Sequence, residues 1–474
     1  MHERVGGQNE GIGTAIVAAV HTLTLRSIEA SVARAAAGAM LNGLHPRLRS
    51  LAAGGSLSDD RPMNAPETAR NLSPRTPRRD PASIRAEDIV GLEMIRRLIA
   101  FPTVSRDSNL ALIEWVRDHV ETLGATTAFT FDDDRRKANL FVTFAAQDGN
   151  ATRGGIVLSG HTDVVPVDGQ PWDTDPWTAT IVGHRLHGRG VTDMKSFSAI
   201  GLAFVPEFLR RGLKRPLHFA LSYDEEIGCI GVRRLIADVV SRGITPTGCI
   251  IGEPTGMQLV VAHKGKKAWR CRVRGHEAHS SLTPRGVNAV QVACDIVAWI
   301  GERARAYRSA QRQDPAYDVP FTTPHVGVIR GGTALNIVPR DCAFEFEIRH
   351  LPFDDPDVFF AEVERFAHSL VPAMKAVDPQ TYIEFDHLST LPGFDDDGRN
   401  AIADIGRECS GAHGTHKVSF GSEAALFHNA SMPAVICGPG HIEQAHQPNE
   451  WVSLEQLAQC EDFMRRLATH LCIA

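Results

Sequence analysis

Two segments of the chain carry apolar residues three or four positions apart, which is the spacing of one face of a helix. They comprise Leu92, Ile95, Leu98 and Ile99 in the first segment and Ile113, Val116 and Val120 in the second. We therefore expect two amphipathic helices soon after Ala86, where the regular pattern begins.

Short apolar runs follow these helices and are separated by helical or loop segments. The runs span residues 139–144, 156–158, 217–221 and 248–251. Alternation of short strands with helices is typical of α/β proteins. The sequence therefore predicts a mostly parallel sheet with helices on both faces, and residues 86–264 would form the first part of this domain.

A different pattern begins near Gly265. Strands are predicted around 268–273, 321–329 and 342–349, and helices around 287–305 and 359–371. This pattern indicates an inserted α+β domain over residues 265–387. The α/β character returns over 388–474, with a buried strand at 433–436 and a last helix that begins at a capping-box pattern formed by Ser453 and Gln456.

The N-terminal part, residues 1–85, is rich in Ala, Gly, Ser, Arg and Pro. Such a segment buries too little apolar surface to offset the entropy of ordering, so we expect it to be disordered. Residues 13–25 are moderately apolar but lack the basic start and cleavage site of a secretory signal. Translation could also begin at Met63, in which case the upstream residues would not belong to the working protein.

Composition narrows the class of protein. A chain of 474 residues is long enough for two or three domains. Its net charge of −6 gives no reason to expect nucleic acid or an anionic membrane as a partner. The nine cysteines are scattered singly without a C-x-x-C pair, which fits a reducing compartment. Because no apolar run approaches the length of a membrane-spanning helix, we expect a soluble cytoplasmic protein.

Histidines and carboxylates gather where the predicted strands end. His161 and Asp163 follow the strand at 156–158, Asp193 follows a glycine-rich turn, and Glu253 and His446 follow later strands. The carboxyl ends of strands are where α/β proteins form sites. Taken alone, His161 and Asp163 could be a polar turn, and Asp193 could be a helix cap.

Glu225 and Glu226 are adjacent carboxylates after the strand at 217–221. With Glu226, the five oxygen and nitrogen ligands suit zinc or cobalt. Two divalent cations would carry four positive charges; three carboxylates and a bridging hydroxide would balance them. Glu225 is then free to act as a base.

Five motifs occur in a characteristic order along the chain: GHTDVVP, TDMK, DEE, GEP and AHQPNE. With them the chain resembles the M20 metallopeptidase family of metal-dependent amidohydrolases, from about Ala86 to the C-terminus. The resemblance implies a cofactor of two divalent ions, Zn²⁺ or Co²⁺. It implies that His161 and Glu253 hold one ion, that Glu226 and His446 hold the other, and that Asp193 bridges them.

The same resemblance implies roles for residues beside the ions. Asp163 would orient His161, and Glu225 would act as general base and then as general acid. The inserted domain at 265–387 matches the family's lid, which mediates formation of a homodimer.

Three residues of the lid resemble functional positions of the family. His279 aligns with a histidine that reaches the partner's site and stabilises the oxyanion, although Ala278 replaces the usual glycine and His276 is the competing choice. Asn336 and Arg349 resemble substrate-binding positions, and Arg349 could grip an α-carboxylate with two hydrogen bonds. Either could instead serve a salt bridge at a strand edge.

The resemblance implies a small N-acyl amino acid as substrate. The runs at 279–281 and 444–448 look like those of a deacetylase rather than a desuccinylase, and aminoacylase and dipeptidase activities remain alternatives. A hypothesis of another class is a non-catalytic metal-binding or interaction protein on a degenerate family fold. Glu225 argues against it, because such a protein has no need for a spare carboxylate beside a complete ligand set.

Overall fold

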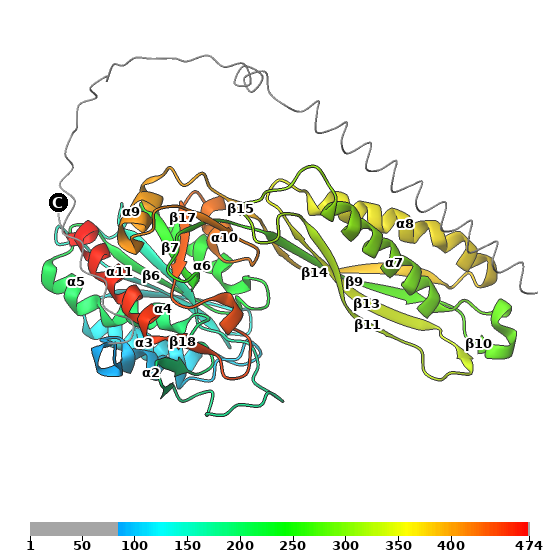
Figure 1. Ribbon diagram of the computed structural model, residues 1–474, viewed down its shortest axis with the longest axis horizontal. Coiled ribbons are helices and arrows are strands. Elements are labelled where there is room, and N and C mark those ends of the chain that lie inside the picture. Colours follow the sequence, from blue (N-terminus) through cyan, green and yellow to red (C-terminus); the bar gives the residue numbers. More distant parts are fainter. Residues whose placement is uncertain (1–83, 473–474) are drawn as a thin grey trace, which may run out of the picture. The chain divides into compact units, whose positions relative to one another are not determined.

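The computed structural model describes residues 84–472 (Figure 1). The expectations for residues 1–83 of the N-terminal extension, including residues 13–25 and Met63, concern residues outside this part of the chain. The predicted boundary at residue 85 is slightly too late, because Ile84 is buried in the core.

A nine-stranded mixed sheet forms the centre of the α/β part (Figure 1). Its strands are β1 (Thr126–Phe131), β2 (Ala138–Phe144), β3 (Ile156–His161), β6 (Leu217–Ser222), β7 (Gly248–Pro254), β8 (Val260–His263), β15 (Phe394–Asp395), β16 (His416–Val418) and β17 (Ala434–Gly438). They lie in the order β1-β2-β6-β3-β7-β17-β8-β15, and β16 pairs with β8. The four central strands β6, β3, β7 and β17 are parallel. The α/β class is confirmed, with antiparallel pairs at both flanks.

Helices cover both faces of this sheet. They are α2 (Leu92–Ile99), α3 (Leu110–Thr122), α4 (Lys195–Ala203), α5 (Val205–Arg211), α6 (Ile230–Ser241), α9 (Ala401–Ser410), α10 (Ala424–Asn429) and α11 (Leu454–Cys472). Successive strand residues face opposite sides. Leu158 therefore packs into the core under α2, α4 and α11, whereas Val157 packs into the core under α6 and α10. The apolar faces predicted for the first two helices are buried.

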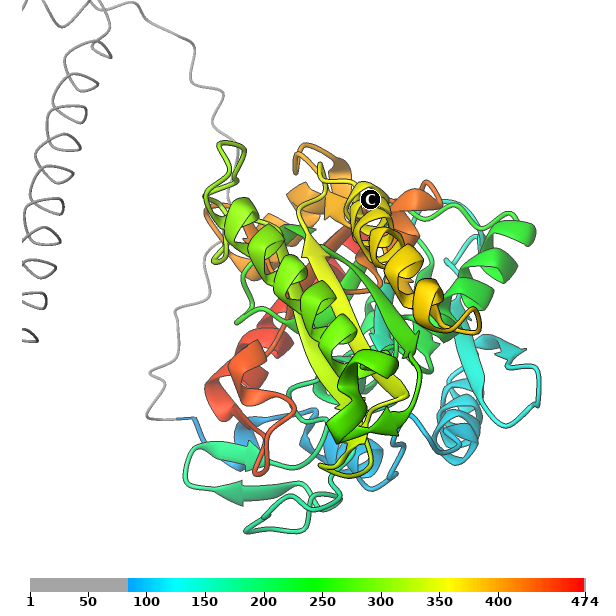
Figure 2. The same cartoon turned by 90° about the vertical axis from the view of Figure 1, so that its right-hand side faces the viewer.

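The inserted part has its own four-stranded antiparallel sheet in the order β11-β13-β9-β14. Its elements are β9 (Gly265–Arg274), α7 (Ala289–Arg308), β11 (Thr323–Gly331), β13 (Asp341–His350), α8 (Pro356–Val377) and β14 (Tyr382–Leu391). The helices α7 and α8 lie side by side over one face of the sheet (Figure 2). The two helices bury the sheet residues Trp269, Phe344 and Phe346. The sheet extends slightly beyond the predicted boundary at residue 387.

Smaller elements complete the chain. They are the strands β4 (Thr180–Val182), β5 (Arg185–His187), β10 (Ala278–His279), β12 (Ile337–Val338) and β18 (Trp451–Ser453), and the 3-10 helices η3 (Ala86–Asp88), η4 (Ser280–Arg285) and η5 (Ile442–Gln444). The strands β18, β5 and β4 form one small sheet, and β10 pairs with β12.

The capping box predicted at the start of α11 is only half formed. The Ser453 hydroxyl accepts the backbone N–H of Gln456 at 3.1 Å. The Gln456 side chain instead accepts the N–H of Gly440 and donates to Gln459. It therefore links the loop after β17 to the helix.

Within residues 84–472, no helix combines the length and apolar character needed to cross a bilayer. All nine cysteines lie in this range as free thiols.

Candidate metal centre

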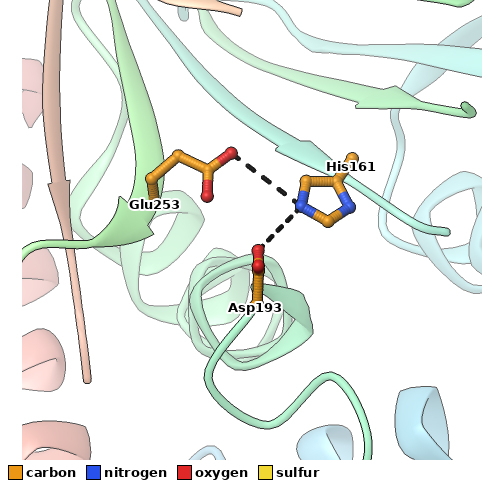
Figure 3. A group of neighbouring side chains, drawn as sticks. All are labelled: His161, Asp193 and Glu253. Carbon is orange, nitrogen blue, oxygen red and sulfur yellow. Dashed lines mark hydrogen bonds and ion pairs between the residues drawn. The ribbon is translucent and has the colours of Figure 1, made fainter. Parts of the chain in front are cut away.

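Three of the candidate ligands meet near the carboxyl ends of the central parallel strands (Figure 3). His161 is the last residue of β3, Glu253 lies near the end of β7, and Asp193 lies in the turn before α4. Because neighbouring parallel strands end at the same edge of the sheet, side chains from distant parts of the sequence converge there.

The first ligand group consists of His161, Asp193 and Glu253. All three are buried, and their ligand atoms lie within 4.8 Å of one another. The His161 Nε2 atom is 3.0 Å from Asp193 Oδ1 and 3.8 Å from Glu253 Oε1 (Figure 3). One imidazole nitrogen and two carboxylate oxygens therefore face a common point.

The second group shares Asp193 with the first. The His446 Nε2 atom is 3.0 Å from Asp193 Oδ2 and 3.1 Å from Glu226 Oε2. Each oxygen of Asp193 thus faces a different group, which is the arrangement expected of a bridging carboxylate. The His446 side chain is 49% exposed, so this side of the centre is open to solvent.

The helix-cap interpretation of Asp193 does not hold. The residue before the first turn of α4 is Met194, and no side chain caps this helix end. The Asp193 carboxylate hydrogen-bonds with His161 and is paired with His446 instead.

The Asp163 carboxylate has different partners from those predicted. The His161 Nδ1 atom contacts the backbone carbonyl of Asp163 at 2.8 Å, whereas the Asp163 carboxylate is 3.7 Å away. That carboxylate accepts the backbone N–H of Glu225 at 3.1 Å and of Glu226 at 3.3 Å, and the hydroxyl of Ser105 at 2.7 Å. It therefore fixes the turn that carries the two glutamates, and the carbonyl orients the ring.

Glu225 belongs to neither ligand group. Its Oε1 atom accepts the thiol of Cys229 at 3.1 Å. Burial raises the pKa of Glu225 to about 8, and the charges of Glu226 and Asp193 add to the rise. A carboxyl group that holds a proton near neutral pH suits acid and base work.

The centre has an excess of negative charge and a free lone pair. Hydrogen bonds to Asp193 and Glu226 raise the pKa of His446 to about 10. Burial, together with the charge of Asp193, raises the pKa of Glu253 well above its usual range. Within the described residues, the buried Oε1 atom of Glu226 has no hydrogen-bond partner. Nitrogen and oxygen donors short of positive charge fit a pair of divalent cations.

The three functional residues predicted in the lid have polar partners other than the candidate ligands, or are exposed. His279 is exposed and its Nδ1 atom contacts the hydroxyl of Ser281 at 2.8 Å. Asn336 is also exposed, on the segment that leads into β12. Arg349 forms an ion pair with Glu347 at 3.0 Å, which is the salt-bridge alternative. Among the described residues, none of the three forms a hydrogen bond or ion pair with a ligand of the centre.

His276, the competing histidine, is engaged in the lid. Its Nδ1 atom lies 2.6 Å from a carboxylate oxygen of Asp378. This contact favours His279 over His276 as the histidine available to another molecule.

Sequence reasoning missed two buried carboxylates near the centre. Glu423 accepts the hydroxyl of Ser159, on the same strand as His161, at 3.0 Å, and that of Ser222 on the neighbouring strand β6. Glu450 pairs with the buried Arg189. Glu450 belongs to the AHQPNE motif and could have been found there, whereas no pattern around Glu423 marks it.

Comparison with known proteins gives relatives along most of the chain. The sequence model of peptidase family M20/M25/M40 matches residues 157–470. An acetylornithine deacetylase of Proteus mirabilis is 32% identical over 391 residues, which cover 81% of this chain and 97% of that protein. Another, from Yersinia pseudotuberculosis, is 31% identical over 80% of this chain and 97% of its own length.

Two solved structures have a similar fold. A tripeptidase of Staphylococcus aureus has a TM-score of 0.63 at 18% identity, and the match covers 82% of this chain and 100% of that chain. A dinuclear metal-binding M20 peptidase of Bacillus subtilis has a TM-score of 0.58 at 14% identity, covering 80% and 97%. Each of these relatives is thus matched almost from end to end.

Proposed function

Because this chain belongs to peptidase family M20/M25/M40 and is therefore a metal-dependent amidohydrolase, we propose that it converts N2-acetyl-L-ornithine to L-ornithine and acetate, a step of arginine biosynthesis. The substrate assignment is supported by the two acetylornithine deacetylases that are 31–32% identical. The observation that carries the catalytic assignment is the pair of ligand groups that share Asp193.

We assign the cofactor as two zinc or cobalt ions. His161 and Glu253 would hold one ion, Glu226 and His446 the other, and Asp193 both. When bound, such a pair lowers the pKa of a water molecule and polarises the carbonyl of the scissile amide. The unpartnered Oε1 atom of Glu226 supports this assignment, since a cation would satisfy it.

Glu225 is the proposed general base. It would take a proton from the attacking water as the oxygen bonds to the carbonyl carbon, and deliver that proton to the leaving nitrogen as the C–N bond breaks. The Cys229 thiol would hold one of its oxygens, and Asp163 would fix its backbone through the N–H of Glu225. The complete ligand set beside a free carboxylate argues against the non-catalytic alternative.

We further propose a homodimer formed through the lid. In it, His279 of the partner subunit would stabilise the oxyanion. Asn336 and Arg349 would bind the substrate, and Arg349 would exchange Glu347 for the α-carboxylate. The exposure of His279 and Asn336 supports this role.

The nine free thiols support a reducing compartment, and we propose the cytoplasm as the location.

A substrate panel on dialysed protein tests the proposed function. The panel contains N2-acetyl-L-ornithine, N-succinyl-diaminopimelate, an N-acetylated neutral amino acid and a dipeptide, each assayed with zinc, cobalt or no metal. We expect the highest kcat/KM for N2-acetyl-L-ornithine, with activity lost on chelation and restored by zinc or cobalt. A higher kcat/KM for another member would reassign the substrate, and no hydrolysis of any member with either metal would refute the reaction class.

A further inference from the structure

We propose that Glu450 is a positioning residue that sets the affinity of the centre for the cation held by Asp193, Glu226 and His446. This inference rests on the proposed function, because it takes those residues as ligands. Glu450 touches no candidate ligand atom itself, and its side chain acts on the backbone that carries them.

One oxygen of Glu450 organises the turn that carries Asp193. The Oε1 atom accepts three backbone N–H groups, those of Gly190 at 3.1 Å, Thr192 at 2.9 Å and Asp193 at 3.2 Å. Three donors that converge on one acceptor fix the peptide planes of the turn. The direction of the Asp193 side chain is set by those planes.

The other oxygen of Glu450 is held by a buried arginine. The Oε2 atom is 2.7 Å from Nη1 of Arg189, and both side chains are excluded from solvent. Arg189 also donates to Gln170 Oε1 at 2.7 Å. A charge-assisted pair of this kind keeps the carboxylate in one orientation.

Glu450 also belongs to the segment that supplies His446. Its backbone carbonyl accepts the N–H of Gly188 at 3.1 Å, and the neighbouring Asn449 exchanges two hydrogen bonds with Asp173. Residue 450 therefore joins two segments that are 257 positions apart in the sequence and that each provide a ligand.

The two ligand groups depend on Glu450 to different degrees. His161 and Glu253 lie on β3 and β7, whose backbones are held by neighbouring strands on both sides. Asp193 and His446 lie outside strands and helices, on the two segments that Glu450 joins. The group of Asp193, Glu226 and His446 thus has two members that rely on Glu450, and the other group has one.

The variant Glu450→Gln tests the proposal. The amide has one accepting oxygen, so it cannot accept the three backbone N–H groups on one atom and a hydrogen bond from Arg189 on the other. Metal-free parent and variant are titrated with cobalt in competition with a chromophoric chelator, and the visible absorption of bound cobalt is recorded. We expect one of the two dissociation constants to rise by about tenfold or more, and the other to change much less.

Glu461→Gln is the matched control. Glu461 is a buried carboxylate that likewise accepts a backbone N–H, from Gly91 at 2.9 Å, and pairs with an arginine, Arg465, at 3.1 Å. It lies in α11, and within the described residues its side chain makes no hydrogen bond or ion pair with the segments that carry Asp193 and His446. Its variant should keep both dissociation constants of the parent.

Asn449→Ala provides a second variant should Glu450→Gln not fold. It removes the two hydrogen bonds to Asp173, at the less buried end of the same segment, and should weaken the same cation by a smaller factor. Unchanged dissociation constants in these variants, an equal rise for both cations, or the same rise in Glu461→Gln would overturn the proposal. A parent protein that binds no cation would overturn the proposed function itself.

Discussion

Glu225 and Glu226 are neighbours in the sequence with different surroundings. Glu226 points toward His446 and Asp193, whereas Glu225 accepts the thiol of Cys229. Asp163 holds both backbone N–H groups and so fixes the turn at which the two side chains diverge. One carboxylate can therefore bind a cation while its neighbour handles protons.

Replacement of Glu225 by glutamine separates these two tasks. We expect turnover to fall by roughly 10²–10⁴-fold, because the amide cannot accept and return the proton. Two ions per chain should remain, because Glu225 belongs to neither ligand group. Steady-state kinetics and metal analysis of the purified variant measure the two effects.

The neighbouring Glu226→Gln is the control for this prediction. It changes the same chemical group one residue away but removes a ligand, so it should lose bound metal as well as activity. Near-parental turnover of Glu225→Gln would show that another group moves the proton.

Motif order was enough to mark the five candidate ligands. His161, Glu226 and Glu253 also lie at or just beyond the ends of strands that the apolar pattern reveals. The partners of Asp163 and Glu450 could not be predicted in the same way. Both carboxylates bind main-chain N–H groups, which every residue carries and no sequence pattern marks. For Glu450 those groups lie in a turn 257 positions away.

At the scale of elements, the contact of α4 with β7 brings Asp193 beside Glu253. It depends on Gly252, where an added Cβ atom would lie 2.1 Å from ring carbons of Phe197. Phe197 is buried in the core, so its ring would have to shift among packed neighbours. A glycine is therefore required at the position before Glu253.

Substitution Gly252→Ala should lower the free energy of unfolding by about 1–3 kcal/mol, through overpacking against Phe197. Urea denaturation of the metal-free protein measures this change. Gly301→Ala is the control: Gly301 lies inside α7 and its nearest neighbouring atom is 3.7 Å from the added methyl. That variant should gain up to about 1 kcal/mol from helix propensity. Equal stability of Gly252→Ala and the parent would contradict the packing argument.

The longer elements were predictable from their apolar residues: α3 buries one apolar face, and β3 begins with an apolar run and is buried throughout. The short strands at one flank of the large sheet could not be predicted from the sequence. β15 and β16 contain two and three residues, too few to show a period, and they pair with β8 only because the fold brings them there. The antiparallel pairing of β15 with β8 follows from such a long-range contact.

At the scale of the whole molecule, the proposed dimer requires a residue of one chain to complete the site of another. His279 makes its polar contacts with Ser281, a near neighbour in the sequence, and is exposed. The insertion itself was predictable from the change in strand pattern near Gly265. The role of His279 was predicted only through the family resemblance, because the proposed role requires a partner subunit that one sequence pattern does not describe.

Co-expression of two inactive variants tests this arrangement. His279→Ala keeps Glu225, and Glu225→Gln keeps His279, so a mixed dimer has one complete site. We expect about a quarter of the parental activity from random pairing, whereas each variant alone should be nearly inactive. Replacing the second partner by a chain with both substitutions should abolish the recovery. No recovery with the intact His279 partner would contradict a site shared between subunits.

The place of β17 between β7 and β8 has a consequence for biosynthesis. A ribosome makes both neighbours before it reaches residue 434, and the intervening stretch takes roughly 10–30 s at ordinary elongation rates. During that interval the edge of β7 is an unpaired strand, which invites association with other nascent chains. The newly made protein thus depends on residues after 433 to complete the sheet and to supply His446. The unpaired edge of β7 is therefore exposed until late in synthesis, when a chaperone could cover it.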